Sequence, residues 1–315
     1  MARTIAVAGA TGSVGRTITE QILNENKFSV IALTRRDPER ILESAISNVQ
    51  YVQVDYDNIL NLAQQLDEHA VHTVICAIGM LGDDCSEAQL NIIKAADQAY
   101  SVQRFITSEF GYMTHEGKRH IDPGVGWFLE AADLLKKTNL TYTRPVCGAF
   151  MDFLGAPHMR SNIPPIPIAV DVLNREAYIP GDGNAILTMI YSYDAATFIA
   201  KLLELDDWPE ISYCAGEDIT FNQVVQLAEE VCGEKFKVIN LNAENIDKGD
   251  IPLLKAHEEI DIPPEEIKAY NVFGYQLYLA GAFHLPSEGR VGDRFPEFET
   301  KTVSEFLNLA WGSRT

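Results

Sequence analysis

Short apolar segments alternate with longer amphipathic segments through the first half of the chain. The short segments are rich in β-branched residues and cover residues 5–8, 30–33, 51–54, 74–77 and 104–107, whereas the longer ones cover 14–23, 59–66 and 88–99. Nearly continuous apolar strands that alternate with helices are typical of a parallel sheet with helices on both faces. The pattern therefore predicts an α/β fold with a doubly wound parallel sheet, which a helix at 126–137 and a strand at 142–146 extend.

The pattern changes after residue 150. Residues 151–167 are rich in aromatic residues and proline, which predicts irregular structure, and residues 169–180 predict a β-hairpin. Capping-box spacings at Thr220 and at Thr302 each predict the start of a helix. These later elements are expected to form a smaller α/β lobe.

The two parts of the chain are expected to interleave. The amphipathic stretch 193–205 looks like a return to the large sheet before the chain leaves it again. We therefore expect one domain from residues 1–150 with about 187–213. The substrate-binding lobe would comprise about 151–186 and 214–315.

Composition excludes several classes of protein. Of the 315 residues, 46% are hydrophobic and 22% are charged, which is typical of a globular protein and not of a disordered or collagen-like chain. The formal net charge is -20, so most of the surface would repel a polyphosphate backbone. We expect no direct binding of nucleic acid.

Membrane, metal and disulfide signals are weak. The longest apolar run, about 73–81, is half of the roughly 20 residues that a membrane-spanning helix needs, and the N-terminus leads directly into a strand pattern. The five cysteines contain no C-x-x-C pair, and the seven histidines contain no H-E-x-x-H motif. We expect a cytoplasmic protein with reduced thiols, no membrane contact and no metal.

A glycine-rich loop joins the first strand to the first helix. Gly9, Gly12 and Gly15 suit, in turn, a tight turn, a close approach of pyrophosphate and close packing of helix on strand. The helix N-terminus that follows offers free N–H groups to phosphate. Thr11, Ser13 and Val14 belong to the same loop. This context predicts a dinucleotide-binding fold of the Rossmann type.

Residues at the end of the second strand indicate which dinucleotide the loop would bind. Arg35 and Arg36 stand where an NAD enzyme would place a carboxylate, and two guanidinium groups suit the 2′-phosphate of NADP(H). The alternative is a solvated pair of charges before a turn. Tyr56, Ala77, Ile78 and Gly79 follow the third and fourth strands, where adenine would lie. Asp55 could contact the base or cap the next helix.

Several motifs resemble one known family. The sequence Arg-Phe-Ile-Thr-Ser-Glu-Phe-Gly at 104–111 is similar to the end of the fifth strand in the NmrA-like and isoflavone-reductase-like family of atypical short-chain dehydrogenases/reductases. Residues 142–150, 216–223 and 294–297 resemble it too. The resemblance implies NADP(H) binding, with Thr107, Ser108 and Phe150 beside the cofactor, and a small aromatic substrate.

The family's general acid, a lysine, is missing. The resemblance places it at about 128–130, where this chain has Phe-Leu-Glu. No tyrosine is followed four residues later by a lysine either. Another group could supply the proton, or the substrate could need none, or no redox turnover occurs. The candidates for the acid lie in the loop after Gly111 and are Tyr112, His115, Glu116, Lys118 and His120.

The resemblance implies that apolar residues near these motifs line a substrate pocket. The set consists of Met80, Trp127, Phe128, Phe150, Met151, Phe153, Leu154 and Tyr191. Core packing is the alternative for each of them. Glu109 and Asp152 flank the region and could bind a substrate amine or phenol, or cap helices.

These expectations lead to one preferred function and two alternatives. The preferred function is an NADPH-dependent reductase of a bulky aromatic or polycyclic molecule, in secondary metabolism. The alternatives are a non-redox enzyme, such as an isomerase or cyclase, that holds NADP in its pocket, and an NADP-sensing regulator. A monomer and a homodimer are both compatible with the sequence.

Overall fold

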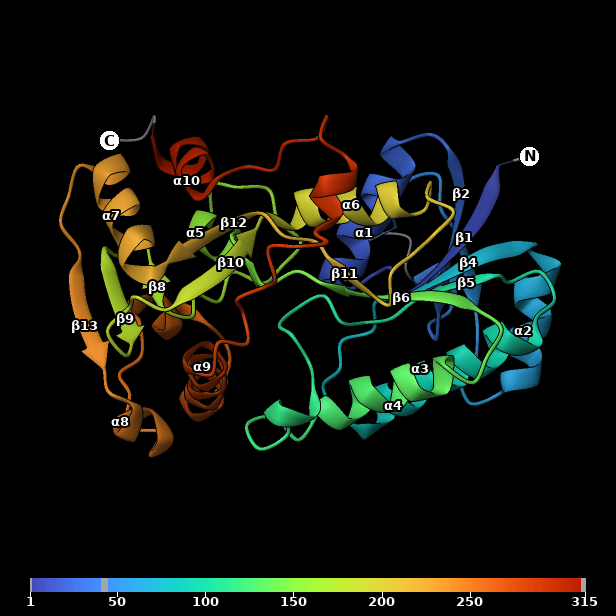
Figure 1. Cartoon of the computed structure of the whole chain (residues 1–315), viewed down its shortest axis with the longest axis horizontal. Helices are drawn as coiled ribbons and strands as arrows, with labels where there is room; N and C mark the ends of the chain where they lie inside the picture. Colours follow the sequence, from blue (N-terminus) through green and yellow to red (C-terminus); the bar gives the residue numbers. More distant parts are fainter. Residues whose placement is uncertain (1, 41–44, 313–315) are drawn as a thin grey trace.

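The computed structural model describes residues 2–40 and 45–312, and its largest sheet has seven strands (Figure 1). The strand order is β11 (Ile211–Tyr213), β6 (Thr141–Val146), β5 (Arg104–Ile106), β4 (Val71–Cys76), β1 (Arg3–Ala8), β2 (Phe28–Thr34) and β3 (Gln50–Gln53). All neighbouring pairs are parallel. The predicted doubly wound sheet is therefore confirmed.

Helices cover both faces of this sheet because successive strand residues point to opposite sides. Ile5 and Val7 pack in one cluster with side chains of α1 (Ser13–Asn24) and α6 (Ser192–Leu202). Ala6 and Ala8 pack in another cluster on the opposite face. The helices of that cluster are α2 (Ile59–Glu68), α3 (Asp83–Gln98) and α4 (Val125–Leu135).

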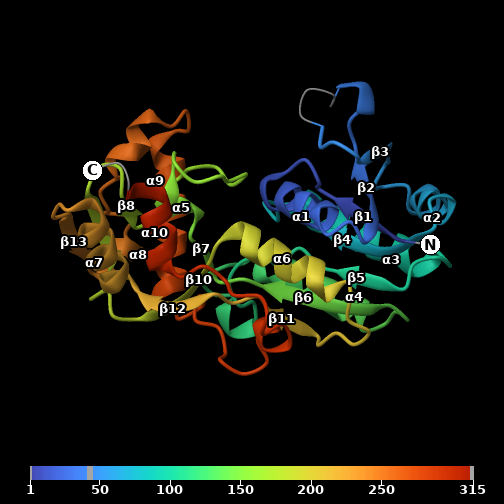
Figure 2. The ribbon, with the colours of Figure 1, turned by 90° about the horizontal axis from the view of Figure 1, so that it is seen from above.

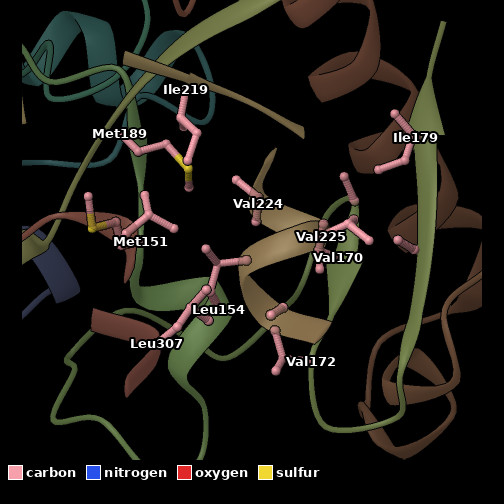
Figure 3. Packing of buried hydrophobic residues seen from close by; sticks show 14 of the residues in the cluster. Met151, Leu154, Val170, Val172, Ile179, Met189, Ile219, Val224, Val225 and Leu307 are labelled. Atoms are coloured by element: carbon pink, nitrogen blue, oxygen red, sulfur yellow. The ribbon is translucent and has the colours of Figure 1, made fainter. Parts of the chain in front are cut away.

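The rest of the chain forms a second lobe beside the large sheet (Figure 2). One of its sheets has the order β12 (Glu217–Thr220), β10 (Ile186–Ile190) and β7 (Ala149–Phe150), and the other has the order β13 (Lys237–Leu241), β9 (Glu176–Pro180) and β8 (Val170–Asp171). The helices are α5 (Asp152–Gly155), α7 (Phe221–Cys232), α8 (Ala243–Asp247), α9 (Pro264–Leu279) and α10 (Val303–Trp311). Met151, Leu154 and Leu307 pack near Val224 in the lobe's core (Figure 3).

Several local predictions are confirmed. β8 and β9 form the expected antiparallel hairpin. Thr220 and Thr302 both begin helices with complete capping boxes. The five cysteines are free thiols. No helix in the described residues is long and apolar enough to cross a membrane, and the lack of membrane contact stays a prediction.

The chain crosses between the two lobes more than once. After β10 it forms α6, which packs against α1, and then β11, which pairs with β6 in the large sheet. β10 itself pairs with β7 and β12 in the smaller lobe, although the sequence pattern predicts residues 187–190 to belong with the large sheet. The division into two domains at the stated boundaries stays a prediction.

Candidate functional site

The glycine-rich loop makes a tight turn between β1 and α1. Gly9 has a φ of +84°, and its carbonyl oxygen accepts a hydrogen bond of 2.9 Å from the Gly12 N–H group. Gly12 precedes α1 and provides no side-chain cap, and the first turn of α1 contains no acidic residue. The N-terminal N–H groups of α1 are therefore not bound by a capping side chain or by a carboxylate of the first turn, and they suit a phosphate.

One cavity of about 230 Å³ lies between the ends of β1, β2 and β4. Its lining includes nine residues predicted for the cofactor, namely Gly9, Thr11, Gly12, Arg35, Arg36, Tyr56, Ala77, Ile78 and Gly79. Leu33, Thr34, Asp84, Cys85 and Ala88 also line it, and these residues were not predicted. The structure thus brings the strand ends together as expected for an adenosine site.

The side chains around this cavity differ in how tightly they are held. Arg35 and Arg36 are exposed, and neither forms a salt bridge within the described part of the chain. Tyr56 is buried and donates a hydrogen bond to the Leu33 carbonyl oxygen, and burial raises the pKa of its phenol. Asn58, not Asp55, caps α2 with its side chain, so the interpretation of Asp55 as the cap is wrong.

A second cleft, of about 440 Å³, continues from the glycine-rich loop to the end of β5. Its lining includes Ser13, Val14, Met80, Ser108, Glu109, Tyr112 and Phe128 from the predicted set. The Ser108 hydroxyl donates to the Ile78 carbonyl oxygen over 2.7 Å, which ties β5 to the end of β4. Thr107 is fully buried and does not line the cleft.

Glu109 is already paired. Its Oε1 accepts from Arg144 Nε over 2.7 Å, and its Oε2 accepts from Arg144 over 2.8 Å and from the Thr114 hydroxyl over 2.6 Å. Both charged side chains are buried. Glu109 therefore fixes the loop after β5 and neither caps a helix nor offers a free carboxylate to a substrate amine.

An apolar cavity of about 280 Å³ lies in the smaller lobe, next to the same loop. Phe150, Phe153 and Leu154 line it, and that they contact a substrate stays a prediction. Phe150, which the family resemblance also places beside the cofactor, does not line the cleft. The lining also includes aromatic residues that were not predicted, namely Phe110, Phe221, Tyr270, Phe273, Tyr275, Tyr278 and Phe283. Tyr270, Phe273 and Leu277 recur at helical spacing on α9, and this signal could have revealed the wall.

Four residues predicted near the pocket lie elsewhere. Met151 and Tyr191 are buried in the core of the smaller lobe and line neither the cleft nor the apolar cavity. They thus have the core-packing role that was their alternative. Trp127 turns outward, and its Nε1 donates to Asp83 over 2.8 Å. Asp152 accepts the N–H of Ser192 over 2.9 Å at the start of α6, and burial raises its pKa. Asp152 thus has the helix-capping role that was its alternative.

The four proposed acids separate in space. Tyr112 lines both the cleft and the apolar cavity. His115 and Lys118 instead line a different surface hollow with His284, and Lys118 Nζ donates to the Ala280 carbonyl oxygen. His120 is exposed and lines neither space.

Glu116, the fifth residue considered, is also engaged at the surface. Its carboxylate pairs with Arg119 over 2.8 Å. Of the candidates in this loop, Tyr112 is therefore the residue that the structure brings to the junction of the two spaces.

The fold and the strand-end site define a doubly wound α/β protein with a glycine-rich phosphate loop. The model of the NmrA-like family matches residues 1–307, and the chain belongs to this family.

Curated and solved relatives agree with the fold. The chain is 28% identical to oxidoreductase swnN of Metarhizium robertsii, with 98% of this chain and 97% of the relative covered. It is 32% identical to oxidoreductase BOA1 of Botryotinia fuckeliana, with 74% and 77% covered. The solved structure of AtPrR2 with NADP+ and (+)pinoresinol superposes with a TM-score of 0.73 at 20% identity, covering 98% of this chain and 99% of that one.

Proposed function

We propose that the protein is an NADPH-dependent reductase of a bulky aromatic or polycyclic small molecule. The observation that carries this proposal is that the cleft beside the phosphate loop and the apolar cavity share Phe110, Gly111 and Tyr112 as lining. A nicotinamide ring in the cleft would lie next to an aromatic ligand in the cavity. Hydride transfer needs this kind of proximity.

The choice of NADP(H) rests on charge. Arg35 and Arg36 are exposed at the rim of the adenosine-sized cavity, where they suit a 2′-phosphate. The names of the two oxidoreductase relatives support a redox function, and the NADP+ bound to AtPrR2 supports this choice of cofactor. Bound NADPH would supply the hydride, while the chain's own residues would hold the two rings together.

One observation favours a second candidate. Phe128 lines the cleft where the family resemblance expects a lysine, so the chain lacks the usual proton donor. A non-redox enzyme, such as an isomerase or cyclase, would not need that donor and could keep NADP as part of its pocket.

Transfer of a labelled hydride separates these functions. The protein is incubated with NADPH carrying deuterium at either C4 position and with a panel of aromatic and polycyclic compounds. Deuterium in the product supports the reductase. Product formed only in the presence of NADP, without cofactor consumption, supports the non-redox enzyme. A protein partner whose binding follows the NADP/NADPH ratio, without turnover, would instead identify a regulator.

Cytoplasmic location, a role in secondary metabolism, and a monomeric or homodimeric state stay predictions. Cell fractionation and light scattering of the purified protein would test the first and the last.

A further inference from the structure

We infer that Tyr112 and Asp122 together select ligands with a hydrogen-bond donor, above all a protonated nitrogen, at the junction of the cleft and the apolar cavity. The inference deepens the proposed function and depends on it, because it assumes that a ligand occupies this cavity. The family's lysine would present a positive charge to the ligand. In this chain the Tyr112–Asp122 pair presents a hydrogen-bond acceptor instead.

One hydrogen bond fixes the direction in which the Tyr112 hydroxyl points its proton. The Tyr112 hydroxyl donates to Asp122 Oδ2. A phenol has one proton and two acceptor lone pairs, so a hydroxyl whose proton points to a carboxylate can only accept further hydrogen bonds. Tyr112 therefore offers an acceptor to a ligand and no donor.

The Asp122 carboxylate that accepts the Tyr112 proton is held by one further hydrogen bond among the described residues. Asp122 Oδ1 accepts the Gly124 N–H group over 2.8 Å, and no salt bridge joins Asp122 to a cation within the residues that the structure describes. The nearby carboxylate of Glu109 is different, because Arg144 neutralises it. Burial raises the pKa of Tyr112, and Asp122 raises it further, so the phenol keeps its proton at neutral pH.

Two further tyrosines in the wall of the apolar cavity also donate their hydroxyl protons to the protein. Tyr275 and Tyr278 donate their hydroxyl protons to the carbonyl oxygens of Ile168 and Ala185, over 2.6 and 2.8 Å. Their protons are thus also committed to the protein. The remaining lining is dominated by aromatic rings, whose faces attract cations. A ligand cation would gain from both the rings and the Tyr112–Asp122 pair, whereas a neutral carbonyl group at the junction would find no free hydroxyl proton on Tyr112. Tyr270, the fourth tyrosine of the lining, is 47% exposed and is the one whose hydroxyl stays available to donate among the described residues.

The experiment compares three ligands of one shape. Protonated 2-naphthylmethylamine carries a donor, 2-naphthaldehyde carries only an acceptor, and 2-methylnaphthalene carries neither. Dissociation constants are measured at pH 7 by calorimetry or fluorescence, with the protein saturated with NADP+ and again without it. We expect the ammonium ligand to bind at least about 10-fold more tightly than the aldehyde, as a charge-assisted hydrogen bond allows.

Two variants test the residues. Asp122→Asn removes the charge and releases the Tyr112 proton, so the ammonium-to-aldehyde preference is expected to fall by about 10-fold or more. Tyr112→Phe is expected to weaken the ammonium ligand and leave the aldehyde unchanged. Asp133→Asn, at an exposed position of α4 away from the cavity, is the matched control that should keep the parent's preference.

Equal binding of the ammonium ligand and the aldehyde by the parent would overturn the inference. A preference that Asp122→Asn leaves within twofold would do the same. Because these measurements need no turnover, their failure differs from that of the proposed function. Deuterium transfer without an ammonium preference would reject only the inference, and a preference without deuterium transfer would reject only the reductase.

Discussion

Gly15 in the first turn of α1 lies so close to Gly9 that a Cβ atom at Gly15 would come 2.2 Å from the Gly9 carbonyl oxygen. A Cβ atom at Gly9 would come 2.5 Å from the Ala77 carbonyl oxygen. Gly12 is less confined, since the nearest atom to its Cβ position is 3.3 Å away. Two of the three glycines therefore shape the loop, and Gly12 leaves space for a ligand.

Substitutions at Gly12 and Gly15 should consequently have different effects. Gly12→Val is expected to fold, because the backbone there is extended with φ -82°, and to lose NADPH binding. Gly15→Ala is expected to lower the free energy of unfolding by about 1–3 kcal/mol through overpacking. Urea unfolding and calorimetric titration measure the two effects. Unchanged NADPH binding by a folded Gly12→Val variant would show that the cofactor site lies elsewhere.

The two exposed arginines should set the choice of cofactor. Replacing Arg35 and Arg36 with alanine is expected to weaken NADPH by about 1.5–3 kcal/mol, the contribution of one or more charge-assisted contacts, while NADH binding changes little. Titration of both cofactors into the parent and the double variant gives the answer. Equal affinities of the parent for NADPH and NADH would remove the argument for the 2′-phosphate.

The sequence predicted the phosphate loop and the parallel sheet because their signals are local. Gly9, Gly12 and Gly15 act through backbone geometry within one turn, and each buried strand has its own apolar run. The capping boxes at Thr220 and Thr302 are equally local. Such features depend on neighbours in sequence, so they could be predicted before the tertiary structure was known.

The apolar wall and the separation of the candidate acids could not be predicted in the same way. Tyr270 and Phe273 lie more than one hundred residues after Phe150, and only tertiary packing places α9 opposite β7. Likewise, Tyr112 and His115 are three residues apart but line different hollows, because the loop turns between them. Sequence distance within an irregular loop does not fix the direction of a side chain.

The buried pair Glu109 and Arg144 should be essential for stability. Glu109→Gln or Arg144→Met is expected to lower the free energy of unfolding by about 3–5 kcal/mol. Each variant leaves the charge of the other residue buried without a partner. The double variant should lose less than the sum of the two. Arg294→Met, which removes an exposed pair with Asp207, serves as the control and should change stability little. Additive losses in urea unfolding would contradict this coupling.

His257 should make the fold sensitive to acid. Its Nδ1 accepts the Leu254 N–H group, its Nε2 bonds the Pro167 carbonyl oxygen, and burial lowers its pKa. The folded state therefore favours the neutral ring, while the unfolded chain takes up a proton near pH 6.5. The stabilisation is present above pH 6.5 and is lost as the pH falls through the lowered folded-state pKa.

The comparison of variants isolates this histidine. His257→Gln should show a shallower fall of the free energy of unfolding between pH 7 and pH 5 than the parent, whereas His284→Gln, an exposed control, should match the parent. The same slope in all three proteins would exclude His257 as the source of the acid sensitivity.

Alanine substitutions in the loop after Gly111 should affect turnover unequally. His115, Lys118 and His120 line neither the cleft nor the apolar cavity, so their alanine variants are expected to keep kcat within a few-fold of the parent. Tyr112→Ala removes a residue that lines both the cleft and the apolar cavity, so the two rings would be held less well against each other, and kcat/KM is expected to fall by roughly 10²-fold. Steady-state kinetics with the substrate identified by deuterium transfer measures each value. A large loss of kcat at His115, Lys118 or His120 with Tyr112→Ala unaffected would move the chemistry to the surface hollow beside His284.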